Sequence, residues 1–153
     1  MLTIATKNIG GIEIDLRESL RGGISYTIDT LKELKVELPN KQFILVLGAD
    51  AICSLKDWYQ VEQLANHCQL LVVNRPDFNI ENERETLEQL GFVFQKSKQK
   101  LVELPSGHYS YFNMNEVDIS STQIREKLEQ GACVNHMIPD EVFDYIQNNS
   151  IYQ

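Results

Sequence analysis

Two uninterrupted apolar runs stand out in the hydrophobic pattern of the chain. Residues 43–47 and 70–73 are almost wholly apolar, which is typical of strands covered on both faces. Apolar positions at helical spacing lie before, between and after these runs, over residues 28–34, 61–65, 81–90 and 142–146. Strands that alternate with helices predict an α/β fold with a largely parallel sheet.

Weaker patterns predict further elements. Residues 1–9 are expected to be the end of a helix, and 12–16 alternate between apolar and polar side chains as a half-covered strand does. Strand pieces are expected at 92–94 and 101–104, on either side of a basic surface loop at 96–100. A β-rich run then covers 109–117, and the last helix is expected to begin at Pro139.

The junction after this run, residues 118–125, carries the strongest chemical signal. Ser120, Ser121 and Thr122 come where a strand stops and a helix starts, and such side chains accept hydrogen bonds from free helix amides. A helix start also suits a phosphate, because its N–H groups are unpaired and carry partial positive charge. Arg125, one turn further on, could reach the same anion. The residues alone leave two interpretations open, a simple helix cap or a phosphate site.

Other polar and aromatic groups follow the predicted buried strands. Gly48 and Asp50 come directly after the first, and Arg75 directly after the second, where doubly wound sheets bind ligands. Trp58 and Tyr59 could stack on a heterocycle. Each group has an ordinary alternative: Asp50 could cap a short helix, Trp58 could pack in the core, and Arg75 could form a surface salt bridge.

Composition narrows the class of protein. The chain has 153 residues, which fits a single domain, and a net charge of −8, which argues against broad nucleic-acid binding. Its three widely spaced cysteines show no metal-ligand spacing and fit a reducing compartment. No apolar run has the length of a membrane span and no leader is visible. The expectation is therefore a soluble cytoplasmic protein without membrane or nucleic-acid partners.

Six segments together resemble bacterial nicotinate-nucleotide adenylyltransferase, a Rossmann-like nucleotidyltransferase. The block at 117–125 is similar to one that runs through the nucleotidyltransferase superfamily. Four others point to the nicotinate-nucleotide branch, and they lie at 21–31, 47–50, 58–59 and 75–76. The sixth segment is the tail at 145–152. The resemblance runs nearly end to end, so residues 1–153 are expected to form one nucleotidyltransferase domain.

The resemblance implies transfer of AMP from ATP to nicotinate mononucleotide, with Mg²⁺ assisting, in NAD biosynthesis. It implies a triphosphate cradle at Ser120, Ser121, Thr122 and Arg125. For the pyridine nucleotide it implies contacts from a second set, which consists of Ser25, Tyr26, Thr27, Gly48, Asp50, Trp58 and Arg75. Adenylyl transfer needs no covalent enzyme intermediate, because positioning two anions and stabilising the transferred phosphate can suffice.

One family feature has no counterpart in the 153 residues. The family begins with a strand and a glycine-rich H-x-G-H loop, whose histidines stabilise the transition state, so no catalytic residue is assigned. His108, preceded by Ser106 and Gly107, only imitates that motif and is expected to lie in a turn.

This departure leads to three expectations. The N-terminal strands of the fold are expected to be missing, and the exposed edge is expected to associate with a second copy or with a chain that supplies them. Little or no adenylyl transfer is expected from the chain alone. The alternatives are a catalytically silent nucleotide-binding module of the same fold, and a transferase that uses nicotinamide mononucleotide or phosphopantetheine as acceptor.

Overall fold

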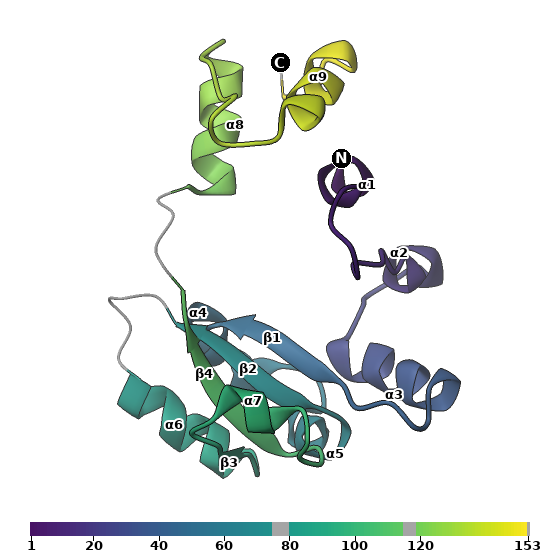
Figure 1. The fold of residues 1–153 in the computed structure, drawn as a ribbon, viewed down its shortest axis with the longest axis vertical. Helices are drawn as coiled ribbons and strands as arrows, with labels where there is room; N and C mark the ends of the chain where they lie inside the picture. The colour runs from purple at the N-terminus through teal and green to yellow at the C-terminus, as the bar shows by residue number, and fades with distance from the viewer. Residues whose placement is uncertain (75–79, 115–118, 153) are drawn as a thin grey trace. The chain divides into compact units, whose positions relative to one another are not determined.

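A computed structural model describes residues 1–74, 80–114 and 119–152, with only the backbone at 74 and 80–82 (Figure 1). Arg75, Pro76 and Asp118 lie outside these residues. The chain forms two compact units. We call Arg17–Glu116 the sheet unit, and Met1–Leu16 together with Val117–Gln153 the helical unit.

A four-stranded, fully parallel sheet organises the sheet unit. Its strand order is β1-β2-β4-β3. The strands are β1 (Ile44–Gly48), β2 (Gln69–Asn74), β3 (Val93–Phe94) and β4 (His108–Asn113). The register aligns Leu47 with Val72, and Val72 with Tyr111. The predicted parallel α/β fold and both predicted apolar strands are therefore confirmed.

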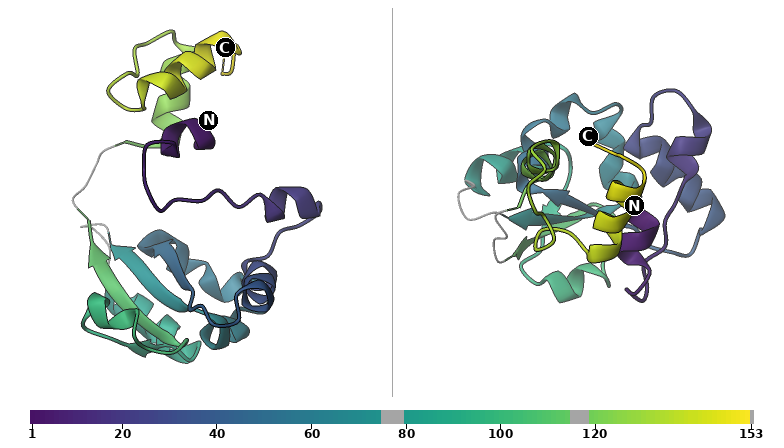
Figure 2. Two further views of the ribbon diagram at one scale, coloured as in Figure 1. Left: turned by 45° about the vertical axis from the view of Figure 1, so that its right-hand side comes forward. Right: turned by 90° about the horizontal axis from the view of Figure 1, so that it is seen from above.

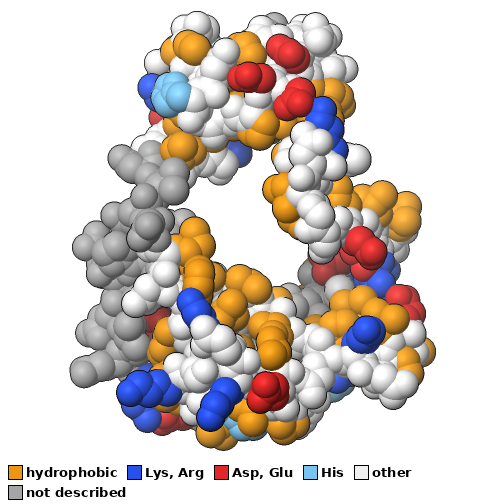
Figure 3. All heavy atoms as spheres, in the orientation of Figure 1, with side chains coloured by type: hydrophobic (Ala, Val, Ile, Leu, Met, Phe, Trp, Pro, Cys, Tyr) orange, Lys and Arg blue, Asp and Glu red, His pale blue; other side chains and the backbone are white. Residues whose placement is uncertain are grey.

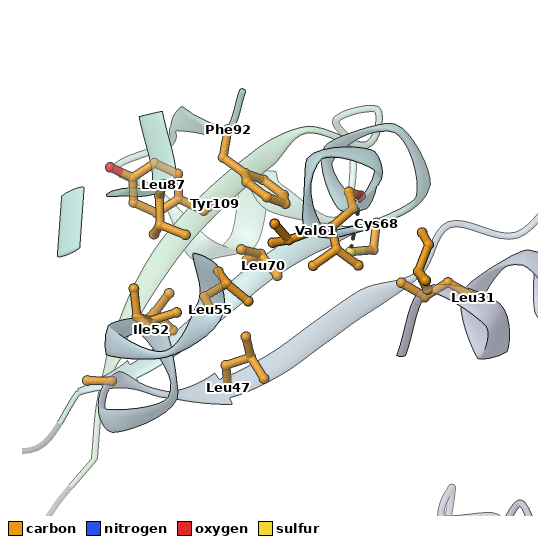
Figure 4. Close-up of a cluster of buried hydrophobic side chains, with 14 residues drawn as sticks. Leu31, Leu47, Ile52, Leu55, Val61, Cys68, Leu70, Leu87, Phe92 and Tyr109 are labelled. Carbon is orange, nitrogen blue, oxygen red and sulfur yellow. Dashed lines mark hydrogen bonds between the residues drawn. The ribbon is translucent and has the colours of Figure 1, made fainter. Parts of the chain in front are cut away.

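One face of the sheet carries the main core. Leu47, Leu70 and Tyr109 point to this face and pack against helices that follow β1 in the chain (Figure 4). Val72 belongs to the same cluster. These helices include α4 (Ala49–Cys53), α5 (Leu64–His67), α6 (Ile80–Gln89) and the 3₁₀ turns η1 (Leu55–Asp57) and η2 (Val61–Gln63). Helices α2 (Arg17–Arg21) and α3 (Thr27–Glu37) precede β1, and Ile28 and Leu31 of α3 join the same core.

The opposite face of the sheet is less completely covered. Helix α7 (Lys98–Leu101) lies on it, since Lys98 Nζ is 3.9 Å from the ring centre of Phe112. Val46 on the edge strand β1 is 58% exposed. The prediction that this strand is covered on both faces is therefore wrong, because Val46 is not covered by the described residues of the sheet unit. Exposed apolar side chains appear among the charged ones in Figure 3.

Two short sequence patterns were misleading. Residues 12–16 form no strand, and Ile12 is 49% exposed, because alternation over five residues cannot hold a strand that has no partner to pair with. Residues 101–104 are not a strand either. The basic segment before them turns into α7, where the Ser97 side chain accepts a hydrogen bond from the Lys100 amide and Leu101 is buried. Ser97 is a helix cap that the high charge of the segment obscured.

The helical unit contains α1 (Leu2–Thr6), α8 (Ser121–Glu129) and α9 (Asp140–Asn148) (Figure 2). Leu128, Val134, Val142 and Ile146 form its small core. The predicted helices at both ends of the chain are confirmed, and Pro139, the predicted start of the last one, is the N-cap residue just before α9. Within the described ranges, no helix is long and apolar enough to cross a membrane.

Glu83 is an unusual member of the sheet unit. It is 3% exposed, and neither carboxylate oxygen has a hydrogen-bond partner among the residues that the structure describes. Burial raises the pKa of its carboxyl above the usual value, because the charged form loses its hydration. Strand β4 also carries two buried hydroxyls, those of Tyr109 and Tyr111, and burial raises the pKa of each.

We expect stability to depend on pH through Glu83. A raised pKa in the folded state gives a contribution that is complete below the unfolded pKa of about 4.3. That contribution is lost as the pH rises through the folded pKa. Urea unfolding from pH 4 to pH 8 should therefore show wild type losing stability relative to Glu83→Gln, which cannot titrate. Parallel stability curves for the two proteins would contradict this.

Candidate functional site

A capping box closes the start of helix α8. The Ser120 side chain accepts a hydrogen bond from the Gln123 amide at 3.1 Å, and the Gln123 side chain accepts one from the Ser120 amide at 2.8 Å. This arrangement satisfies two N–H groups that a helix start would otherwise leave unpaired. The predicted N-cap is therefore confirmed, at Ser120.

The capping box leaves part of the helix start open. The Ile124 amide donates to the Ser120 carbonyl, but no acceptor is recorded for the amides of Ser121 and Thr122 in the part of the chain that the structure describes. Both side chains are exposed. Arg125 is also exposed and forms no ion pair with a described residue. Two free amides, two hydroxyls and one unpaired guanidinium thus face solvent within one helical turn, an arrangement that suits a phosphate.

The role of Ser120 as a cap can be tested separately. Ser120→Ala removes one half of the box and should lower the free energy of unfolding by about 1 kcal/mol. Urea unfolding without ligand measures this effect. Thr122→Ala is the control, because its hydroxyl caps nothing in the free protein, and its stability should stay within about 0.5 kcal/mol of wild type. Equal losses in the two variants would contradict the cap.

The carboxyl end of β1 leads into α4 through Gly48 and Asp50. Gly48 is the N-cap residue of α4, and it has no side chain to cap with. Asp50 lies in the first turn, and its Oδ1 folds back so closely that a Cβ at Gly48 would collide with it. The alternative of Asp50 as the N-cap is wrong. The Asp50 carboxylate is exposed and has no partner among the described residues, so it is available to a ligand.

Two tyrosine rings pack against each other, one at the start of α3 and one in the turn after η1. The rings of Tyr26 and Tyr59 have centroids 4.3 Å apart and planes 32° apart. Tyr59 is 48% exposed, whereas Trp58 is half-buried and packs against the main core. The core-packing alternative for Trp58 is therefore confirmed for one part of its side chain, and the other part is exposed to solvent.

Three residues of the predicted acceptor set lie at or just before the start of α3. Tyr26 is the N-cap residue of α3, and Thr27 is its first residue. Ser25 donates a hydrogen bond to the Glu18 carbonyl at 3.3 Å. The structure thus brings Tyr26 next to Tyr59, and Asp50 over Gly48. Arg75 lies outside the described residues, and Ser120 to Arg125 belong to the helical unit.

Two residues of this region had no signal in the sequence. Gln60 has left-handed backbone angles, φ 51° and ψ 38°, and it joins Tyr59 to Lys32 of α3 through its side chain. Lys32 and Gln60 are 28 positions apart, so only the fold brings them together. The prediction that His108 lies in a turn is wrong: His108 is the first residue of β4, and the chain bends just before it, at Gly107, which has φ +87°.

One surface hollow of the helical unit is lined by other residues. An open hollow of about 620 Å³ lies beside the last turn of α8, with Leu128, Cys133 and Phe143 in its lining. It includes none of the predicted site residues. Among residues 1–74, 80–114 and 119–152, no cluster of three or more His, Cys, Asp or Glu side chains is placed to hold a metal ion.

Comparison with solved structures supports the fold. The nicotinic acid mononucleotide adenylyltransferase of Plasmodium falciparum, solved in complexes with APC and with NaAD, is similar to this chain with TM-scores of 0.70 and 0.68 at 24% identity. In the APC complex the similarity covers 99% of this chain and 72% of the other. The fold is therefore the Rossmann-like one that the sequence predicted.

Sequence comparison reaches further. The model of the cytidylyltransferase-like family matches residues 1–127. A relative from Pseudomonas entomophila, named "probable nicotinate-nucleotide adenylyltransferase", is 38% identical over all of this chain and 70% of its own length. A relative of the same name from Legionella pneumophila is 34% identical, over 73% of its length. This chain belongs to the nicotinate-nucleotide adenylyltransferase family.

Proposed function

We propose that the protein transfers AMP from ATP to nicotinate mononucleotide, giving deamido-NAD and pyrophosphate. The observation that carries the proposal is the open start of α8, with the free amides of Ser121 and Thr122 beside the unpaired Arg125. It occurs in a chain that aligns along its whole length with relatives named for this activity. An unpaired cation and free amides in one helical turn suit the polyphosphate that the reaction consumes.

The helical unit would bind the triphosphate. Ser121 and Thr122 would donate their amides and hydroxyls to phosphate oxygens, and Arg125 would make a forked contact. Ser120 would hold the helix start in shape through its capping box. Mg²⁺ would arrive with ATP as part of the substrate and neutralise phosphate charge.

The sheet unit would bind the acceptor. Tyr26 and Trp58 would contact the pyridine ring, and the unpaired carboxylate of Asp50 would accept a hydrogen bond from the nucleotide. Ser25, Thr27, Gly48 and Arg75 complete the proposed acceptor set. A phosphate oxygen of the acceptor would attack the α-phosphorus of ATP, and the bond to the β-phosphate oxygen would break. The contribution of the protein is to orient the two anions and to stabilise the charge between them.

The experiment is an acceptor comparison with the purified protein. MgATP is supplied with nicotinate mononucleotide, nicotinamide mononucleotide or phosphopantetheine, while pyrophosphate and the adenylylated product are measured. Calorimetry measures the binding of each nucleotide. Turnover that is fastest with nicotinate mononucleotide would support the proposal.

Each other outcome has a definite meaning. Binding of ATP and nicotinate mononucleotide without turnover would identify a silent nucleotide-binding module. Faster turnover with another acceptor would overturn the acceptor assignment. Loss of a single hydrogen bond to the carboxylate of the pyridine can change such preferences strongly, so all three acceptors are compared under the same conditions.

A further inference from the structure

Three contacts tie the turn at residues 58–60 to helix α3. The rings of Tyr26 and Tyr59 lie 4.3 Å apart. Lys32 Nζ donates a hydrogen bond to Gln60 Oε1 at 2.8 Å, and Gln60 Nε2 donates one to the Tyr59 hydroxyl at 2.9 Å. The Gln60 amide therefore links a cation on the helix to the aromatic ring beside it in sequence.

The backbone of Gln60 is strained. Its left-handed angles bring a Cβ close to the following carbonyl oxygen, a cost that glycine avoids. Two backbone hydrogen bonds hold the turn in this conformation. The Val61 amide donates to the Trp58 carbonyl, and the Gln63 amide donates to the Gln60 carbonyl. Since Gln60 directly follows Trp58 and Tyr59, fixing its side chain also limits the positions of both rings.

Lys32 is an unusual partner for this amide. It is half-buried and bonds to a neutral side chain, and no carboxylate of the described residues forms an ion pair with it. Its charge is therefore uncompensated by any described carboxylate, and the Gln60 side chain links it to Tyr59, the residue next to Trp58 of the proposed acceptor set. An anionic nucleotide would be attracted there.

We propose that Lys32 and Gln60 are positioning residues for the acceptor, which hold Trp58 and Tyr59 in the geometry that a pyridine nucleotide requires. The inference rests on the proposed function. Because Gln60 acts through its hydrogen bond to Lys32, removing both residues should weaken acceptor binding no more than the more damaging of the two single changes. The strain at Gln60 makes the proposal testable without loss of stability, since Gln60→Gly removes the side chain and relieves the backbone.

The experiment uses Trp58 as its probe. It is the only tryptophan in the chain, so fluorescence excited selectively at tryptophan reports on the turn alone. Nicotinate mononucleotide is titrated into wild type, Gln60→Gly, Lys32→Met and the double variant. We expect each single variant to bind about 10-fold more weakly, the size of one lost charge-assisted hydrogen bond. The double variant should bind no more weakly than the weaker single variant.

Melting temperature and ATP affinity separate positioning from general damage. Gln60→Gly should melt no lower than wild type, while acrylamide should quench Trp58 more readily in it. The control is Glu62→Gln in the next turn, an exposed residue whose change should leave nicotinate mononucleotide affinity within about 2-fold, as expected for a surface substitution. ATP affinity should be unchanged in all variants.

The remaining outcomes overturn one proposal or both. Equal affinity of Gln60→Gly and wild type would overturn the positioning role and leave the proposed function standing. Additive losses in the double variant, or losses that always accompany a lower melting temperature, would do the same. Failure of wild type to bind nicotinate mononucleotide would overturn the proposed function, and the inference with it.

Discussion

Arg125→Ala is expected to weaken ATP binding by about 10- to 100-fold, since a hydrogen bond to a charged group contributes about 1.5–3 kcal/mol. The guanidinium is exposed and forms no ion pair with a described residue. Its removal should therefore leave the free energy of unfolding almost unchanged. The affinity for nicotinate mononucleotide should stay at the wild-type value. Calorimetric titration with MgATP and with the acceptor measures both effects.

Two further variants show whether the contact is specific. Lys127→Ala removes a similar exposed charge from the same helix, two residues further along, and should have a much smaller effect on ATP binding. Arg125→Lys keeps the charge and loses the forked geometry, so it should recover part of the affinity. If Arg125→Ala and Lys127→Ala weaken ATP binding equally, general charge attraction would explain the result and the phosphate cradle would be wrong.

Trp58→Ala is expected to weaken nicotinate mononucleotide binding by about 5- to 100-fold, the range for stacking a heterocycle on an aromatic side chain. The ring also packs against the core, so the free energy of unfolding should fall by about 2 kcal/mol, less than for a fully buried tryptophan. ATP affinity should not change. Calorimetry is the measurement here, because the fluorescent probe is lost.

Trp58→Phe separates the two roles of this residue. It keeps an apolar ring and most of the packing, so it should recover much of the stability and part of the acceptor affinity. If Trp58→Ala lowered the melting temperature and left acceptor affinity intact, Trp58 would be a core residue only. In that case the acceptor ring would have to be sought beside Tyr26 and Tyr59.

Patterns that depend on near neighbours in the chain were sufficient for most of the fold. The apolar runs at 43–47 and 70–73 predicted two parallel strands, and the Ser-Ser-Thr cluster predicted the cap of α8. Both follow from local physics: side-chain burial repeats with the period of the element, and a cap lies within three residues of the amide that it satisfies. The fold class and the family could therefore be recognised from the residues alone.

Other features depend on contacts between distant residues. The exposure of Val46 depends on which elements pack against β1. The N-cap residue of α4 is Gly48 and not Asp50, which depends on where the helix begins. Lys32 and Gln60, which link helix α3 to Tyr59, are 28 positions apart in the sequence. Gln60 also has left-handed backbone angles that its residue type does not predict. Sequence by itself determined the order of the elements and the residue types at their ends. Only the tertiary structure decided which of those side chains are already paired and which are free, because pairing depends on distances that the chain acquires when it folds.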